Sequence, residues 1–143
     1  MTTYALIHGA GDVGWYWHLV ESELQARGHR TVAPDLPIED DDATLLDNAQ
    51  VVLDAINSSH DGGELIVVGQ SYGGYVAPIV AHLAKADCLV LVAPMIPRPG
   101  ETADEMWKAT GWRMPQDESG PIAVFYHDVD PSRMSWRAAT LRR

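Results

Sequence analysis

Leu65-Ile66-Val67-Val68-Gly69-Gln70-Ser71-Tyr72-Gly73 is the stretch that decides the fold. Its first half is a run of branched apolar residues, which is typical of a buried strand. Its second half is a Gly-x-Ser-x-Gly motif, and the apolar residues between Val76 and Leu83 recur at helical spacing. A strand, a sharp turn that carries a serine and a helix form the arrangement that exposes a reactive hydroxyl above a sheet. The motif occurs often by chance, so its position between strand and helix is what makes it informative.

Three other apolar runs, at residues 4–8, 30–33 and 88–93, have the character of buried strands. Between them, apolar residues recur at helical spacing over residues 17–24, where Gly28 provides a stop, and over residues 45–56, where Asp42 is placed to cap the helix. The single cysteine, Cys88, is expected to be a small buried side chain in the last run. Such strands alternating with helices predict a mostly parallel sheet covered on both faces, an α/β three-layer sandwich.

The composition changes after the last of these strands. Prolines crowd residues 94–100 and predict a linker. Thr102 and Glu105 match a capping box, and the helix that they open should end near Gly111. Asp130, which a proline follows, predicts the start of a terminal helix. We therefore expect a core over residues 1–97 and added helical material over residues 98–143.

The charge of the chain restricts its partners. The sequence holds 20 acidic residues against 10 Lys and Arg, which gives a formal charge of −10 at pH 7. Such a surface repels phosphate backbones and anionic headgroups, which argues against nucleic-acid and membrane partners. One cysteine can form neither an intrachain disulfide nor a zinc site. Since no apolar stretch approaches the roughly 18 residues that span a bilayer, and the N-terminus has no signal-like features, we expect a cytoplasmic protein that acts on a small molecule.

Residues 4–95 resemble the α/β-hydrolase superfamily, and the branch of plant-type esterases and hydroxynitrile lyases is the most similar. Three pieces carry the resemblance: His8-Gly9-Ala10-Gly11 after the first strand, Ala33-Pro34-Asp35-Leu36-Pro37 after the second, and the serine motif after the third. The resemblance implies the N-terminal portion of that fold, followed by part of a helical lid over residues 98–143. It also implies a reaction on a small carboxylic ester or related carbonyl compound, with no cofactor and no metal. Lyase, thioesterase and amidase chemistry share the motif and stay open.

The resemblance also assigns roles to particular residues. Ser71 would be the nucleophile. The backbone amides of Ala10 and Tyr72 would form an oxyanion hole, in which two preorganised donors stabilise the charge of a tetrahedral intermediate. Gly69 and Gly73 would leave room for the tight turn around the serine.

A serine hydroxyl also needs a general base. His8 and Gly9 form a structural dipeptide in the family, so His8 is expected to anchor a loop. His82 lies 11 positions along the helix that Ser71 opens, roughly 16 Å away at 1.5 Å per residue. His127 remains as a weak candidate. Because the family carries its acid and base on later strands, we expect the chain to stop within the lid, to turn over little or no ester, and to leave a sheet edge exposed to dimerisation.

Two other functions stay open. Gly9-Ala10-Gly11-Asp12-Val13-Gly14 also matches a dinucleotide-binding fingerprint, and Asp35 lies 21 residues past Gly14, near the place of a ribose-binding carboxylate. Two observations argue against dinucleotide binding. The aromatic residues at 15–17 crowd the start of the helix, where a pyrophosphate would need access. The function of an NAD(P)-binding protein would also leave the serine motif unexplained. The third possibility is a hydrolase scaffold that binds a small apolar ligand without catalysis. Four tryptophans, at positions 15, 17, 107 and 112, permit such binding, but tryptophans are more often packing residues than ligand contacts.

Overall fold

The computed structural model of the chain describes residues 1–111, and the chain divides into two units after Pro97. Four strands form one parallel sheet in the order β2-β1-β3-β4: β1 (Thr3–Ile7), β2 (Arg30–Val32), β3 (Leu65–Gln70) and β4 (Cys88–Val92). The central pair aligns Thr3 with Leu65 through Ile7 with Gly69. The α/β class predicted from the alternation of strands and helices is confirmed.

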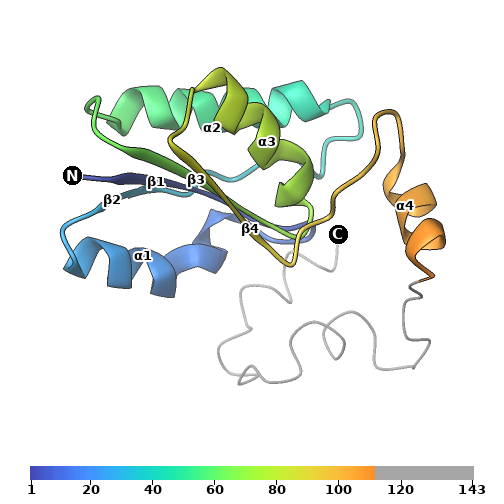
Figure 1. The fold of residues 1–143 in the computed structure, drawn as a ribbon, viewed down its shortest axis with the longest axis horizontal. Helices are drawn as coiled ribbons and strands as arrows, with labels where there is room; N and C mark the ends of the chain where they lie inside the picture. Colours follow the sequence, from blue (N-terminus) through green and yellow to red (C-terminus); the bar gives the residue numbers. More distant parts are fainter. Residues whose placement is uncertain (112–143) are drawn as a thin grey trace. The chain divides into compact units, whose positions relative to one another are not determined.

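Helices cover the two faces of this sheet (Figure 1). The short 3-10 helix η1 (Gly14–Trp17) and α1 (His18–Ala26) lie on one face. The other face carries α2 (Leu45–Ser59) and α3 (Gly73–Leu83). In the second unit, α4 (Ala103–Thr110) begins with the predicted capping box and ends at Gly111, which adopts a φ of 72°. None of the helices within residues 1–111 is long and apolar enough to cross a bilayer.

The apolar core lies mainly between the sheet and α2 and α3. Val67 at the centre of β3 is fully buried there, together with Val52 of α2 and Val76 of α3. A smaller cluster on the other face joins Leu6 and Val68 to Trp17 at the start of α1. Two apolar layers on a single sheet make the three-layer arrangement, and they fix the positions of the loops at the carboxyl ends of the strands.

Two details of the helices differ from the sequence-based expectation. The cap of α2 is Thr44, whose hydroxyl accepts a hydrogen bond from the Asp47 N–H, while the Asp47 carboxylate accepts one from the Thr44 N–H. The predicted cap, Asp42, instead lies in the preceding turn, where its N–H donates to Asp40 Oδ1. In α1, Val20 of the predicted apolar stripe is 42% exposed, because no described element covers that side of the helix.

The strand β4 also differs from the expectation of full burial. All five of its residues are exposed, including Cys88, which was expected inside the core. The reason is its position at the end of the sheet, since β3 is its one strand neighbour among residues 1–111. On the face that α1 shares, no described helix lies over β4 (Figure 1).

Candidate functional site

Ser71 occupies the turn between β3 and α3 with a φ of 51°, which is the left-handed region that a side chain disfavours. Three hydrogen bonds hold this bend. The Ser71 N–H donates to the carbonyl of Val92 at 3.2 Å, and the Ser71 carbonyl accepts from Gly74 at 2.9 Å and from Met95 at 2.8 Å. A strained residue that its surroundings fix in this way is typical of a functional site. The half-buried serine therefore stands on a sharp strand-to-helix turn at the carboxyl end of the sheet.

The glycines around the serine are required by close backbone contacts. A Cβ atom at Gly69 would lie 2.6 Å from Ala77 Cβ and from the Gly73 carbonyl oxygen. One at Gly73 would lie 2.7 Å from the carbonyl oxygen of Ile7 in β1. Real Cβ atoms essentially never approach so closely. The spacing of the motif thus follows from the packing of α3 against β1 and β3.

The loop after β1 lies directly against the serine. A Cβ atom at Gly9 would lie 3.1 Å from Ser71 Cβ and 2.5 Å from Gln70 Oε1. The next residue, Ala10, is exposed, and Tyr72 occupies the N-cap position of α3. Within residues 1–111, the N–H groups of Ala10 and Tyr72 donate to no protein acceptor. The assignment of these two amides to an oxyanion hole stays a prediction; among residues 1–111 no acceptor occupies them.

His8 is fully buried and bonds in two directions. Its Nε2 accepts a hydrogen bond from the N–H of Leu36 at 3.0 Å, so the ring proton sits on Nδ1, which donates to the Gly9 carbonyl at 2.8 Å. Both ring nitrogens are thus occupied. The imidazole ties the loop after β1 to the loop after β2 and has no free nitrogen with which to act as a base.

Asp35 and Gly14 join the same two loops and account for the dinucleotide-like glycine pattern. The Gly14 N–H donates to Asp35 Oδ1 at 2.7 Å. A Cβ atom at Gly14 would overlap the Ala33 carbonyl oxygen at 1.9 Å. The carboxylate that the fingerprint assigns to a ribose therefore binds a backbone amide, and the third glycine is explained by loop contact. Neither feature favours an NAD(P) site.

Asp12 is a buried carboxyl group that sequence reasoning did not single out. It is 8% exposed and lies in the loop beside the serine turn, where burial raises the pKa of its carboxyl group to about 7. Burial also raises the pKa of the half-buried Tyr72 phenol. The sequence offers no signal for the burial of Asp12, because an acid in a glycine-rich loop is normally solvated.

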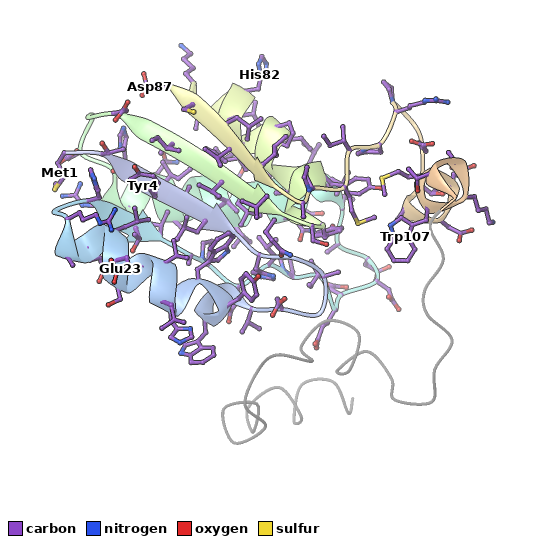
Figure 2. The ribbon with its side chains drawn as sticks, turned by 60° about the horizontal axis from the view of Figure 1, so that its bottom comes forward. Met1, Tyr4, Glu23, His82, Asp87 and Trp107 are labelled. Carbon is purple, nitrogen blue, oxygen red and sulfur yellow. The ribbon has the colours of Figure 1, made fainter. Side chains whose placement is uncertain are left out.

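No histidine of residues 1–111 hydrogen-bonds to Ser71. His18 stacks on Trp15 with ring centroids 3.7 Å apart, and His60 Nδ1 lies 3.0 Å from Thr3 Oγ1. His82 is exposed near Asp87, at the amino end of β4 and far from the serine turn (Figure 2). His127, the weak candidate base, lies outside the described residues, and so does the helix predicted to start at Asp130.

Two further features do not add to the site. A shallow recess of about 370 Å³ runs along α1, where residues 19–27 line it, and Ser71 does not border it. Among the described residues, no group of three His, Cys, Asp or Glu side chains is placed to hold a metal ion.

The sequence of this chain is similar to a known family and to several curated proteins. A family model described as "Alpha/beta hydrolase family" matches residues 5–143. Methylesterase 7 of Arabidopsis thaliana is 31% identical over 104 residues, which cover 66% of this chain and 40% of that protein. Norfluorocurarine synthase 2 of a Strychnos species is 30% identical over 103 residues, which cover 66% of this chain and 39% of that protein. The chain thus spans about two-fifths of the length of these curated relatives.

Solved structures share the fold. Polyneuridine aldehyde esterase superposes with a TM-score of 0.64 at 21% identity, over 82% of this chain and 49% of that one. A pyrethroid hydrolase from Sphingobium faniae superposes with a TM-score of 0.59 at 28% identity, over 71% of this chain and 43% of that one. In each case the likeness extends over less than two-thirds of the solved chain.

Proposed function

Since this chain belongs to the alpha/beta hydrolase family, we propose that it carries the nucleophile half of a serine esterase, with Ser71 as the attacking residue. One observation supports this above all: Ser71 holds a φ of 51° at the strand-to-helix turn, among glycines that no larger residue can replace. A methylesterase and a pyrethroid hydrolase among the similar proteins fit a small carboxylic ester as the substrate class.

The proposed chemistry is acyl transfer through a covalent intermediate. The Ser71 Oγ attacks the carbonyl carbon of the ester, the hydroxyl proton passes to a base, and the carbonyl oxygen becomes an oxyanion. The amides of Ala10 and Tyr72 stabilise that oxyanion, and the start of α3 adds a favourable dipole. Collapse breaks the bond to the alkoxide, which takes the proton back from the base and leaves as the alcohol, while the acyl group stays on Ser71. Water that the same base deprotonates then attacks this acyl group and releases the acid and the free Ser71 hydroxyl.

The base is the part of this scheme that residues 1–111 do not supply, because every histidine among them is anchored, stacked or remote from the serine. We propose that the 143-residue chain turns over esters slowly or not at all by itself. The oxyanion hole can still provide some catalysis without the base, so a weak burst is compatible with the proposal. A cytoplasmic setting suits a chain with one cysteine, and we include it in the proposal.

Labelling with a fluorophosphonate probe tests the nucleophile separately from turnover. We expect slow, stoichiometric labelling that peptide mapping assigns to Ser71 and that Ser71→Ala abolishes. Ser135→Ala, at a serine outside the motif, is the matched control and should label normally. Labelling that survives in Ser71→Ala would remove the proposed nucleophile. Rapid turnover of 4-nitrophenyl acetate by this chain, lost in both Ser71→Ala and His127→Ala, would show that the chain has its own base.

The second candidate function is a scaffold that binds a ligand without catalysis. It is favoured by the lack of a histidine base bonded to Ser71 within residues 1–111. In that case a small ester binds saturably, as intrinsic tryptophan fluorescence can report, while Ser71 stays unlabelled. The same labelling experiment therefore separates the two functions.

A further inference from the structure

Two consecutive side chains at the end of β3 support the loop that follows β1. A Cβ atom at Gly9 would lie 2.5 Å from Gln70 Oε1, 3.4 Å from Gln70 Cδ and 3.1 Å from Ser71 Cβ. The backbone at Gly9 stays outside the left-handed region, so its φ does not require a glycine. The glycine is explained by close approach, and the atoms that it approaches belong to Gln70 and Ser71.

The carboxamide of Gln70 is enclosed where it meets the loop. Gln70 follows Val68 by two residues in β3, so both side chains lie on the sheet face that carries Trp17. Gln70 Oε1 is buried, and it accepts no hydrogen bond within residues 1–111. Because this oxygen is enclosed, the carboxamide cannot turn away from Gly9 without leaving a void. It is therefore a fixed support for the loop.

The peptide that joins Gly9 to Ala10 is also held by its carbonyl group. The Gly9 carbonyl accepts hydrogen bonds from His8 Nδ1 at 2.8 Å and from the Asp12 N–H at 3.3 Å. This peptide is trans and planar, so the Ala10 N–H lies in the same plane and points opposite to the carbonyl. The two donors thus fix the direction of the Ala10 N–H, while the contact of Gly9 with β3 fixes its distance from Ser71.

We propose that Gln70 is a positioning residue for the Ala10 amide, a role that rests on the proposed function of the serine turn. Its carboxamide is the spacer between β3 and the loop after β1. Because the Ala10 nitrogen is bonded directly to the Gly9 carbonyl carbon, a shift of Gly9 moves this donor with it. An oxyanion needs its donors in place before the charge develops, so a small shift slows the attack by Ser71.

A neutral side chain suits this position. Gln70 Oε1 and Ser71 Cβ both lie within 3.1 Å of the point where a Cβ atom of Gly9 would stand. The carboxamide is therefore close to the place where the oxyanion forms. Glutamate has the same shape as glutamine, but its negative charge would repel that oxyanion.

The rate constant for fluorophosphonate labelling of Ser71 tests the spacer. Gln70→Ala removes the carboxamide, and we expect labelling at least about tenfold slower, because misplacement by about 1 Å can cost about 100-fold in rate. Gln70→Met fills a similar volume and should slow labelling by no more than about threefold. Gln50→Ala, at an exposed glutamine of α2 that bonds to Asp54, is the matched control and should label at the natural rate. Equal rates for Gln70→Ala and Gln50→Ala overturn the proposal.

The variant Gln70→Glu gives a pH profile that a merely structural role would not change. At low pH the new carboxyl group is neutral and keeps the shape of glutamine. Between about pH 5 and 9 it ionises, and its labelling rate relative to the natural chain should fall at least about tenfold, because the carboxylate repels the oxyanion. The same ratio for Gln70→Met should stay constant. A constant ratio for Gln70→Glu overturns the placement of this side chain beside the oxyanion.

Amide hydrogen exchange followed by NMR tests the support of the loop without any reaction at Ser71. The Asp12 N–H bonds to the Gly9 carbonyl, so it should exchange at least about fivefold faster in Gln70→Ala than in the natural chain. The Gly74 N–H, which bonds to the Ser71 carbonyl, should exchange alike in both. Faster exchange at Asp12 in a chain that no probe labels would support the contact while removing the proposed nucleophile. Unchanged exchange at Asp12 overturns the inference, whatever the labelling shows.

Discussion

Ser71 keeps a backbone conformation that costs free energy for any residue with a Cβ atom. The cost of the left-handed region is roughly 1–2 kcal/mol relative to glycine. We therefore expect Ser71→Gly to be more stable than Ser71→Ala by about 1 kcal/mol. Urea unfolding of the two variants, followed by circular dichroism, measures this difference.

The control for this comparison is a serine in ordinary helical conformation. Ser58 lies in α2, where its hydroxyl bonds to the Asp54 carbonyl. Inside a helix glycine is less favourable than alanine by about 0.5–1 kcal/mol, so the order of the two variants should reverse there. If the alanine variant is more stable than the glycine variant at both positions, Ser71 does not hold this bend in solution.

Asp12 should make the stability of the protein depend on pH. Burial raises the pKa of its carboxyl group to about 7, whereas the unfolded chain has an ordinary aspartate near 3.8. Between about pH 4 and 7 the folded chain keeps a proton that the unfolded chain has lost, so stability is highest below this window and falls as pH rises through it. Above pH 7 the buried charge costs on the order of 2–4 kcal/mol.

The variant Asp12→Asn removes this charge while it keeps the size of the side chain. We expect it to be more stable than the natural chain at pH 8 and about equally stable at pH 4.5. Urea unfolding at the two pH values gives the comparison. Asp54→Asn, at an exposed acid of α2, is the control and should change little at either pH. Parallel pH profiles for Asp12→Asn and the natural chain would mean that Asp12 is solvated.

At the scale of elements, the capping box sets the start of α2. Thr44→Ala removes a hydroxyl that bonds to both the N–H and the carboxylate of Asp47. Loss of such a cap costs about 1 kcal/mol. Asp42→Ala, two residues earlier, should cost less than about 0.5 kcal/mol because Asp42 does not cap the helix. Thermal unfolding of the two variants tests the assignment, and a larger loss for Asp42→Ala would reverse it.

These elements also show how far sequence reasoning extends. The strands and the serine turn were predictable because apolar runs and paired glycines leave few alternatives. The cap of α2 was not, because Asp42 and Thr44 are both good caps and only the backbone path decides between them. An exposed sheet edge was expected, but neither the exposure of the β4 side chains nor the burial of Asp12 was predictable. Burial depends on what lies beside a residue in space, and its own side chain does not encode that.

At the scale of the whole molecule, the net charge of −10 opposes any association between copies. At about 10 mM salt this repulsion reaches roughly 30 Å, whereas at about 150 mM it is screened beyond roughly 8 Å. Salt should therefore strengthen any self-association that buries apolar side chains without ion pairs. Sedimentation at the two salt concentrations measures the trend. Association that weakens with salt would indicate an interface built on opposite charges.

One imidazole joins parts of the chain that lie 28 residues apart, since His8 bonds both to its neighbour Gly9 and to Leu36. The Gly14 contact with Asp35 doubles this connection. Chimaeras that exchange these loops with those of a related protein must therefore transfer residues 8–14 and 33–38 together. A graft of only one loop would leave the His8 ring nitrogen without its donor or the Gly14 amide without its acceptor, and the loops beside Ser71 would lose their arrangement although no residue of the serine turn had been mutated.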